Sequence, residues 1–306
     1  MRIPAELAET LAAIVDEGTL DAAARRLHIT PSAVSQRVKA LEEQLGQVVL
    51  VRSKPARLTA AGTAVVRMAR QVALLEHDTL AELGESAGEG TRTSVPLAVN
   101  ADSLATWFLD PLARLSERHP VVFELHRDDQ DFTARLLESG TVMGAVTSRS
   151  TPVAGCRVSE LGAMRYEAVA TPAFVQRWLP DPTSLGSLVE APLVDFDRRD
   201  DLQTQWLGRQ GIESALTARH FVPASNDFAA AVRRGLGWGL LPRFQSQDAL
   251  DAGELVLLGG PPIDVPLYWQ QWNLRSPLLD AIAHELVREG RRVLSPLSRH
   301  RPASAG

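Results

Sequence analysis

Apolar residues near the N-terminus recur at intervals of three and four positions, which is the spacing of helices with one buried face. This spacing predicts three helices, over residues 3–17, 20–27 and 31–45. Thr19 and Thr30 precede the second and third helices, where a hydroxyl accepts a hydrogen bond from a free N–H group of the first turn. Gly18 and Gly46 follow the first and third helices and are expected to end them.

The third predicted helix carries two faces of different chemistry. Its apolar stripe consists of Val34, Val38, Leu41 and Leu45. The opposite face of its first half holds short donors and acceptors that suit base edges, beside cations that suit phosphates. Two helices joined by a tight turn, the second polar at its N-terminal end, are typical of a helix-turn-helix. The expected DNA contacts are Thr30, Ser32, Ser35, Gln36, Arg37 and Lys39.

Residues 48–59 predict a two-stranded wing, with an apolar strand, a basic turn and a return to a threonine. Three cations near its tip complete the expected DNA contacts, namely Arg52, Lys54 and Arg57. Residues 22–58 contain seven Lys or Arg and two acidic residues, a local charge of +5 in a chain of net charge −5. This asymmetry indicates a polyanionic partner. The alternative is an ordinary helical hairpin with a solvated charged face.

These elements resemble a known family. The stretch PSAVSQRVKALEEQLGQVVLVRSKPARLTAAG, residues 31–62, is similar to the N-terminal winged helix of LysR-type transcriptional regulators. The resemblance covers about the first 90 residues and includes the order of the elements. It implies an all-α winged helix-turn-helix that reads double-stranded DNA as a dimer, followed by a C-terminal effector domain.

A long helix is predicted after the wing, starting at the cap Thr59 and running for about 25 residues, or about 40 Å. Its apolar residues fall mostly at heptad spacing, with Thr79 at one position of the seam. They are Val65, Met68, Val72, Leu75 and Leu83. We therefore expect a homodimer packed along this helix, whose recognition helices read inverted half-sites. The alternative is that the apolar stripe packs on the effector domain of its own chain. Separately, the resemblance to LysR-type regulators implies a tetramer.

Strands and helices alternate beyond a Gly/Ser/Thr-rich segment at 84–94, which favours parallel sheets with crossover helices. Two such units suggest an α/β bilobal domain, similar to periplasmic binding proteins, with two strands crossing between lobes near 162–170 and 265–272. The predicted parts are a DNA-binding domain (1–58), a linker helix with hinge (59–90), an effector domain (91–296) and a disordered tail (297–306). Lobe I is expected at 91–161 and 269–296, and lobe II at 162–268.

Composition narrows the functional classes. The 306 residues are 45% hydrophobic and 23% charged, as in ordinary soluble proteins of two or three domains. No apolar run approaches the ~20 residues that span a bilayer, and the N-terminus does not resemble a signal peptide, so we expect a cytoplasmic protein without membrane contact. The single cysteine, Cys156, excludes an internal disulfide. Because nucleophile, phosphate-binding and metal-ligand motifs are missing, we expect no enzyme, cofactor or metal site.

A ligand site is expected beyond the carboxyl ends of strands, at helix N-termini. Free N–H groups and a serine at one such helix start suit a carboxylate, and acidic residues after the next strand suit a cation. This combination fits a zwitterion with an extra cation, such as a basic amino acid. The candidate contacts are Asn100, Asp102, Ser103, Trp107, Asp129, Thr147, Asn226 and Asp227.

Simpler explanations exist for several of these residues. Asp102, Ser103 and Asn226 fit helix N-caps, and Trp107 fits the core as well as a ligand wall. The acidic run 128–131 also fits a solvated turn.

A closer resemblance concerns the segments VNADSLATWF, MGAVTS, GLGWGLLP and VPLYWQQW, together with Asp129. They are similar to the branch of the LysR family that contains ArgP and LysG, regulators that sense lysine or arginine. This resemblance implies that Ser103 and Thr147 bind the α-groups of the amino acid. It also implies that Asp129, or else Asp102 or Asp227, pairs with the side-chain cation.

The sequence thus predicts a transcriptional regulator that responds to lysine or arginine and controls a gene of amino acid export or metabolism. The alternatives are a LysR-type regulator of another small metabolite, a bilobal solute-binding protein, or an enzyme on the same scaffold.

Overall fold

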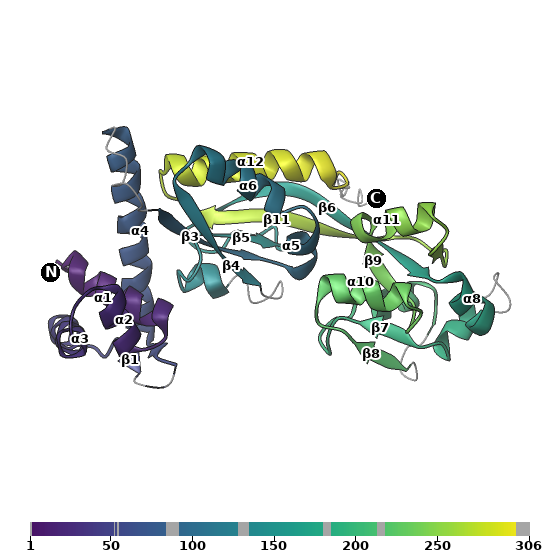
Figure 1. Cartoon of the computed structure of the whole chain (residues 1–306), viewed down its shortest axis with the longest axis horizontal. Coiled ribbons are helices and arrows are strands. Elements are labelled where there is room, and N and C mark those ends of the chain that lie inside the picture. The colour runs from purple at the N-terminus through teal and green to yellow at the C-terminus, as the bar shows by residue number, and fades with distance from the viewer. Residues whose placement is uncertain are drawn as a thin grey trace, which may run out of the picture.

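The computed structural model describes residues 2–51, 53, 55–83, 92–127, 135–179, 185–212 and 218–297. A small helical domain lies at one end, a long helix stands beside it, and an elongated α/β domain extends away from that helix (Figure 1). Within the described ranges, no helix has the length and apolar character needed to cross a membrane.

The helical domain begins with α1 (Ala5–Glu17), α2 (Leu20–Arg26) and α3 (Pro31–Leu45). Both predicted caps are confirmed, because the Thr19 hydroxyl accepts from the N–H of Ala22 at 3.2 Å and the Thr30 hydroxyl from the N–H of Ala33 at 3.1 Å. Gly46 ends α3 with φ of +64°, a conformation that favours glycine. The shared core includes Leu7, Leu11, Ile14, Val34, Val38 and Leu41.

The predicted wing is present as an antiparallel pair, β1 (Leu50–Val51) and β2 (Arg57–Leu58). Two of the expected DNA contacts, Arg52 and Lys54, lie outside the described residues. The long helix α4 (Ala60–Glu82) follows at once. Its cap is Thr59, as predicted, whose hydroxyl accepts from the N–H of Gly62 at 3.1 Å and donates to the carbonyl of Val48 at 2.7 Å.

The apolar positions of α4 do not form one continuous exposed seam. Val65 is buried in the core of the helical domain, and Met68 packs against it. Leu74 belongs to the core of the α/β domain instead. Two residues of the predicted stripe remain exposed, Leu75 at 40% and Leu83 at 70%. The expected heptad seam is therefore wrong in its first half, because the helical domain itself covers that half.

The main sheet of the α/β domain has the strand order β10-β6-β11-β5-β3-β4, with β9 paired to β6. Its parallel strands are β3 (Thr93–Val99), β4 (Val121–Arg127) and β5 (Gly144–Thr147). Its other strands are β6 (Cys156–Ala170), β9 (Gly239–Pro242), β10 (Val256–Leu257) and β11 (Ile263–Trp272). A second, parallel sheet pairs β7 (Leu193–Asp195) with β8 (Arg219–Phe221).

Helices cover these sheets in the expected alternation. They are α5 (Ala101–Thr106), α6 (Leu109–Arg118), α8 (Pro172–Trp178), η1 (Leu185–Val189), α9 (Leu202–Arg209), α10 (Ser225–Arg233), α11 (Arg243–Asp251) and α12 (Pro277–Val293). The helical segment after β3 is interrupted between α5 and α6, and α6 begins two residues before Pro111. Helix α11 was not predicted.

Two long antiparallel strands, β6 and β11, run through both lobes (Figure 1). They lie where the sequence placed the crossing strands, but β6 begins earlier, at Cys156. Their register shifts between Leu267 and Tyr268, opposite Gly162, whose φ is +139°. Gly162 also has no room for a side chain, because a Cβ would lie 2.7 Å from the Cβ of Leu294.

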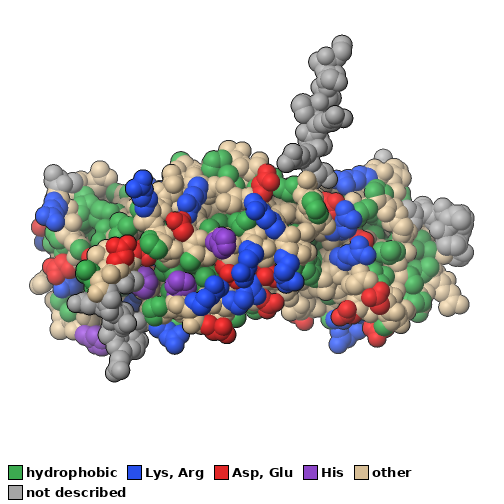
Figure 2. All heavy atoms as spheres, turned by 90° about the horizontal axis from the view of Figure 1, so that it is seen from above, with side chains coloured by type: hydrophobic (Ala, Val, Ile, Leu, Met, Phe, Trp, Pro, Cys, Tyr) green, Lys and Arg blue, Asp and Glu red, His purple; other side chains and the backbone are tan. Residues whose placement is uncertain are grey.

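The helices α6 and α12 are joined over lobe I by an ionic network. Glu285 accepts from Arg114 at 2.6 Å, and Glu289 accepts from the same guanidinium at 2.6 Å. Both glutamates are almost fully buried, and Arg118 and Arg288 add further ion pairs to Glu285. Basic side chains gather with acidic ones in the middle of this face (Figure 2).

Candidate functional site

The first candidate site is the exposed face of α3 and the neighbouring wing. Ser32, Gln36 and Lys39 are exposed there, and Ser35 is half-buried. Lys39 forms an ion pair with Glu43 at 3.5 Å on the same helix, with both side chains largely exposed. Arg57 is exposed at the start of β2. The described part of this surface thus presents polar and basic groups to solvent, as the sequence suggested.

Arg37 differs from its neighbours because its guanidinium turns back to α1. It donates to the hydroxyl of Thr10 at 3.2 Å and pairs with Glu6 at 3.3 Å. The Thr10 hydroxyl in turn donates to the carbonyl of Glu6 at 2.7 Å. In this arrangement Arg37 connects the recognition helix to α1, and its contact with DNA stays a prediction.

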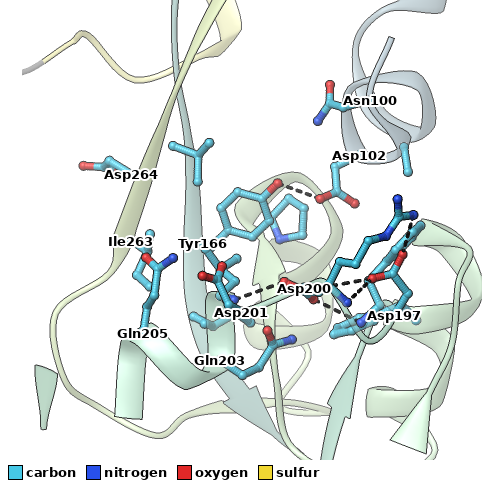
Figure 3. Close-up of a pocket in the computed structure, with 18 of the residues that line it drawn as sticks. Asn100, Asp102, Tyr166, Asp197, Asp200, Asp201, Gln203, Gln205, Ile263 and Asp264 are labelled. Carbon is cyan, nitrogen blue, oxygen red and sulfur yellow. Dashed lines mark hydrogen bonds and ion pairs between the residues drawn. The ribbon is translucent and has the colours of Figure 1, made fainter. Parts of the chain in front are cut away.

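The second candidate site is a cavity of about 460 Å³ between the two lobes (Figure 3). Lobe I contributes the start of α5, and lobe II contributes the loop after β7, the start of α9 and part of α10. The crossing strands β6 and β11 line it between the lobes. Its polar lining includes Asn100, Asp102, Tyr166, Asp197, Arg199, Asp200, Asp201, Gln203, Gln205, Arg209, Gln245 and Asp264.

Asp102, on α5 of lobe I, contacts both the crossing strand β6 and helix α10 of lobe II. Its carboxylate accepts from the hydroxyl of Tyr166 on β6 and from the hydroxyl of Ser225 on α10, both at 2.6 Å. Burial, together with the adjacent Asp102, raises the pKa of Tyr166 well above its ordinary value, so the phenol stays protonated and donates. Ser225 also accepts from the amide of Gln245 at 3.0 Å. Asp102 therefore holds lobe I against lobe II.

The loop after β7 carries three more carboxylates, two of which contact the backbone. Asp197 accepts from the N–H of Arg199 at 2.7 Å and the N–H of Asp200 at 3.1 Å. Burial opposes its charged form, but these hydrogen bonds and the Arg199 guanidinium outweigh burial and lower the pKa of Asp197. Asp200 accepts from the N–H groups of Phe196 and Leu202 at 3.0 and 3.1 Å.

The pKa of Asp200 is raised, first by burial and then by the negative charges of Asp102 and Asp201. Asp102 reaches the cavity from lobe I, and Asp200 reaches it from lobe II (Figure 3). At the edge of the cavity, Asp264 is already neutralised by two hydrogen bonds of 2.8 Å from Arg165. A cation placed between Asp102 and Asp200 would relieve their repulsion, so the cavity is suited to a positively charged ligand.

The predicted ligand contacts are only partly brought together. Asn100 and Asp102 line the cavity, and the Oδ1 atom of Asn100 is buried without a hydrogen bond. Ser103 is fully buried behind them. Trp107 belongs to the core of the α/β domain, so the simpler explanation holds for that residue. Asp129 lies outside the described residues.

The other three predicted contacts do not line this cavity. Thr147 is buried at the end of β5, where its hydroxyl accepts from the N–H of Arg149 at 3.2 Å. Asn226 and Asp227 are exposed in the first turn of α10. Asn226 is not the cap of that helix, because the N-cap position is Ala224. Their roles as ligand contacts therefore stay predictions that this cavity does not support, since strand ends and helix starts in one domain need not face the same space.

The loop 197–201 and Tyr166 also line the cavity but were not predicted from the sequence. The run DFDRRDD follows a predicted strand of the second lobe, at its carboxyl end. The same rule that selected Asn100 and Asp102 also applies to this run. Tyr166 gave no such signal, because it lies inside a strand.

Comparison with known proteins places these features in a family. Residues 6–63 match the bacterial regulatory helix-turn-helix protein model of the lysR family. Residues 88–291 match the LysR substrate binding domain. The HTH-type transcriptional regulator LysG of Mycobacterium tuberculosis is 48% identical over 273 residues, covering 89% of this chain and 88% of the relative. The lysine export transcriptional regulatory protein LysG of Corynebacterium glutamicum is 42% identical over 284 residues, covering 91% and 95%.

Solved structures agree over nearly the whole chain. ArgP from Mycobacterium tuberculosis has a TM-score of 0.83 and 44% identity, covering 97% of this chain and 100% of that structure. Full-length LysG from Corynebacterium glutamicum with bound effector Arg has a TM-score of 0.75 and 40% identity, covering 96% and 100%.

A winged helix-turn-helix, a long linker helix and a bilobal domain around a cleft define a ligand-responsive transcription factor. The chain belongs to the LysR family of bacterial transcriptional regulators, and its near relatives are the LysG and ArgP regulators. The predicted fold and family resemblance are confirmed, and the non-enzymatic class follows from the family.

Proposed function

We propose that this protein binds L-arginine or L-lysine in the cleft between its lobes and thereby changes its binding to DNA. The observation that carries this proposal is the set of carboxylates that face one cavity from both lobes. One relative supports it in two ways: LysG of Corynebacterium glutamicum is named for lysine export, and its structure holds arginine as bound effector. The regulated gene is proposed to serve export or metabolism of a basic amino acid.

In this proposal the side-chain cation of the amino acid lies between Asp102 and Asp200, one from each lobe. The unpartnered Oδ1 of Asn100 offers a further acceptor beside them. The α-carboxylate is assigned to the guanidinium groups that line the cavity, those of Arg199 and Arg209. Ser103, Thr147, Asp129 and Asp227 remain proposals from the family resemblance alone.

Because the ligand contacts both lobes, it favours the setting of the lobes in which both sets of contacts are made. A ligand shifts such an equilibrium only by its difference in affinity for the two states, typically ~1–3 kcal/mol. That difference is the free energy available for changing DNA binding.

The DNA contacts are proposed to come from residues 1–58, and the helix and hinge at 59–90 are proposed to join them to the effector domain at 91–296. Base edges are assigned to Ser32, Ser35 and Gln36, and phosphates to basic side chains. The remaining proposed contacts are Thr30, Lys39, Arg52, Lys54 and Arg57. A dimer through α4 would present two such surfaces to inverted half-sites, and a tetramer in the cytoplasm is the proposed working form.

The test is calorimetric titration with L-arginine, L-lysine and L-citrulline, which has the shape of arginine without its charge. We expect binding of arginine or lysine and at least tenfold weaker binding of citrulline. Asp200→Asn should weaken binding of the basic amino acid by about tenfold, or about 1.4 kcal/mol, because it removes one of the two facing charges.

The matched control is Asp264→Asn, which removes a carboxylate from the same cavity that already pairs with Arg165. This variant should bind within about threefold of the unmodified protein. Equal binding of citrulline and arginine, or equal losses in the two variants, would contradict the proposed recognition of the cation.

A further inference from the structure

Arg70 on α4 contacts two different domains of the same subunit. Its Nη1 donates to the carbonyl of Gly140 in lobe I, and its Nη2 pairs with Asp16 on α1, both at 2.5 Å. The side chain is only 13% exposed, so these contacts are shielded from solvent. One guanidinium therefore ties the DNA-binding domain, the linker helix and the effector domain together.

The turn at Gly140 is built to lie directly against α4. Gly140 has φ of +71°, and a Cβ there would lie 2.5 Å from the Cβ of Arg67. Arg67 also donates to the carbonyl of Glu138 at 3.3 Å. A larger residue at 140 would push this turn away from α4 and would break the contact with Arg70.

A chain of contacts leads from Arg70 to the recognition helix. Asp16 lies at the end of α1, near Arg26 of α2, which pairs with it at 3.1 Å. At the other end of α1, Glu6 and Thr10 hold Arg37 of α3. Because α1, α3 and the start of α4 share one hydrophobic core, a displacement of Asp16 is passed on to α3.

A second chain leads from Gly140 to the cleft. The turn continues through Thr141, whose hydroxyl is 2.7 Å from that of Ser139. The N–H of Met143 then donates to the carbonyl of Pro96 on β3 at 2.9 Å. Strand β3 ends directly before Asn100, which lines the cavity. The turn is thus fixed to the strand that carries the lobe I side of the ligand site.

We infer that Arg70 couples the ligand cleft to the DNA-binding domain within each subunit, by holding Asp16 and the Gly140 carbonyl at the same time. The inference rests on the proposed function in that the signal is the binding of a basic amino acid. That the signal passes through Arg70 rests on its contacts with Asp16 and Gly140. The other contacts described where α4 meets α1 and lobe I each join α4, or α2, to one domain only. Leu74 and His77 contact lobe I, His77 through the hydroxyl of Thr93 at 2.6 Å, whereas Arg26 contacts α1.

The experiment measures the affinity for a DNA duplex, selected from random sequences with the unmodified protein, with and without saturating L-arginine. The ratio of the two affinities is the coupling factor, which is typically about 5- to 150-fold. In Arg70→Met and in Gly140→Ala this factor should fall to within about twofold of 1. The affinity for L-arginine alone should stay within about threefold, because neither residue lines the cavity.

Arg26→Met is the matched control, because it removes the other partner of Asp16 without touching lobe I. Its coupling factor should equal that of the unmodified protein. An unchanged factor in Arg70→Met, or an equal loss in Arg26→Met, overturns the inference.

A second measurement does not depend on the effector. Spin labels at Gln47→Cys, after α3, and Glu117→Cys, on α6, report the distance between the domains in a Cys156→Ala background. Arg70→Met should broaden this distance distribution, and Arg26→Met should not. If neither L-arginine nor L-lysine changes DNA binding of the unmodified protein, the proposed effector is wrong and the label distances decide the inference alone. A distribution in Arg70→Met as narrow as that of the unmodified protein then overturns it.

Discussion

Arginines of this protein differ in what their guanidinium groups contact, and that difference decides their roles. Arg37 lies on the recognition helix but contacts Glu6 and Thr10 of α1. Lys39, half a turn further along α3, is largely exposed. Arg37 has two partners on another helix, whereas Lys39 has a largely exposed ion pair with Glu43 on its own helix, which is worth little and is easily exchanged for a phosphate. We therefore assign Lys39 to DNA and Arg37 to the packing of the domain.

Arg37→Ala should lower the free energy of unfolding by about 0.5–1 kcal/mol, because it removes a partly exposed ion pair and a hydrogen bond. It should leave unchanged the slope of log affinity for DNA against log salt concentration. Lys39→Ala should reduce that slope by about 1, the value for one phosphate contact. Denaturant titration and salt-dependent DNA binding check both. A smaller slope in Arg37→Ala would show that its guanidinium does reach a phosphate.

Among the elements, α6 and α12 are joined by buried carboxylates and surface arginines. The pKa of Glu285 is lowered, because hydrogen bonds from Arg114 and Arg118 outweigh the opposing effect of burial. The pKa of Glu289 is lowered mainly by Arg292 and by Arg114, again against burial. A carboxyl whose folded-state pKa is depressed adds stability above its unfolded pKa and loses it as the pH falls through the folded pKa.

Glu285→Gln should therefore destabilise the effector domain at pH 7 by about 1–2 kcal/mol, since it removes charge-assisted hydrogen bonds. The difference from the unmodified protein should shrink as the pH falls below about 4.3, the ordinary pKa of glutamate. Thermal unfolding between pH 3 and 7 measures it. A difference that is constant with pH would mean that the network contributes packing alone.

Elements with a strong local signal were predictable. The threonine caps of α2, α3 and α4 and the glycine ends of α1 and α3 follow from groups within three residues, and the strand β3 is a largely apolar run. Helix α11 was missed because its buried positions are the small residues Ser246 and Ala249, which give little apolar contrast. The early start of β6 was missed because residues 156–160 are half-buried or exposed and do not alternate.

The site was predictable only as far as one lobe. Asn100 and Asp102 follow a strand end, and that rule needs no tertiary information. Which other strand ends face the same cavity depends on how the lobes meet, so the sequence indicated Asn226 and Asp227, whereas the loop 197–201 lines the cavity. The contact of Arg37 with Glu6 was not predictable for a similar reason, since the two residues are 31 positions apart.

At the scale of the whole molecule, α4 presents an apolar strip that nothing in the described part of the chain covers. Leu75, Leu80 and Leu83 are 40%, 39% and 70% exposed, whereas Val65 and Leu74 are buried by the two domains. Leu75 and Leu83 belong to the second half of the predicted seam, whereas Leu80, three positions before Leu83, was not part of it. A second copy of α4 is the partner that this strip fits, because homodimers bury matching apolar faces.

The double variant Leu75→Glu/Leu83→Glu should therefore sediment as a monomer at micromolar concentration. Its DNA affinity should fall by at least 100-fold, because two linked sites bind far more tightly than one. Leu257→Glu, at a leucine that is 55% exposed on β10, serves as the control and should keep the oligomer. Analytical ultracentrifugation distinguishes the outcomes, and an intact oligomer in the double variant would place the interface elsewhere.

The two continuous strands between the lobes restrict how the molecule can respond to its ligand. The paired strands β6 and β11 resist stretching and sliding because of their hydrogen bonds. The movement they permit between the lobes is bending about the short stretch where Gly162 faces the register shift. Opening and closing then follow a single coordinate with a fixed axis. A small angular change at that axis becomes a larger linear movement at the far ends of the lobes. A shift of less than one ångström between the groups that line the cleft is then enough to reposition neighbouring subunits.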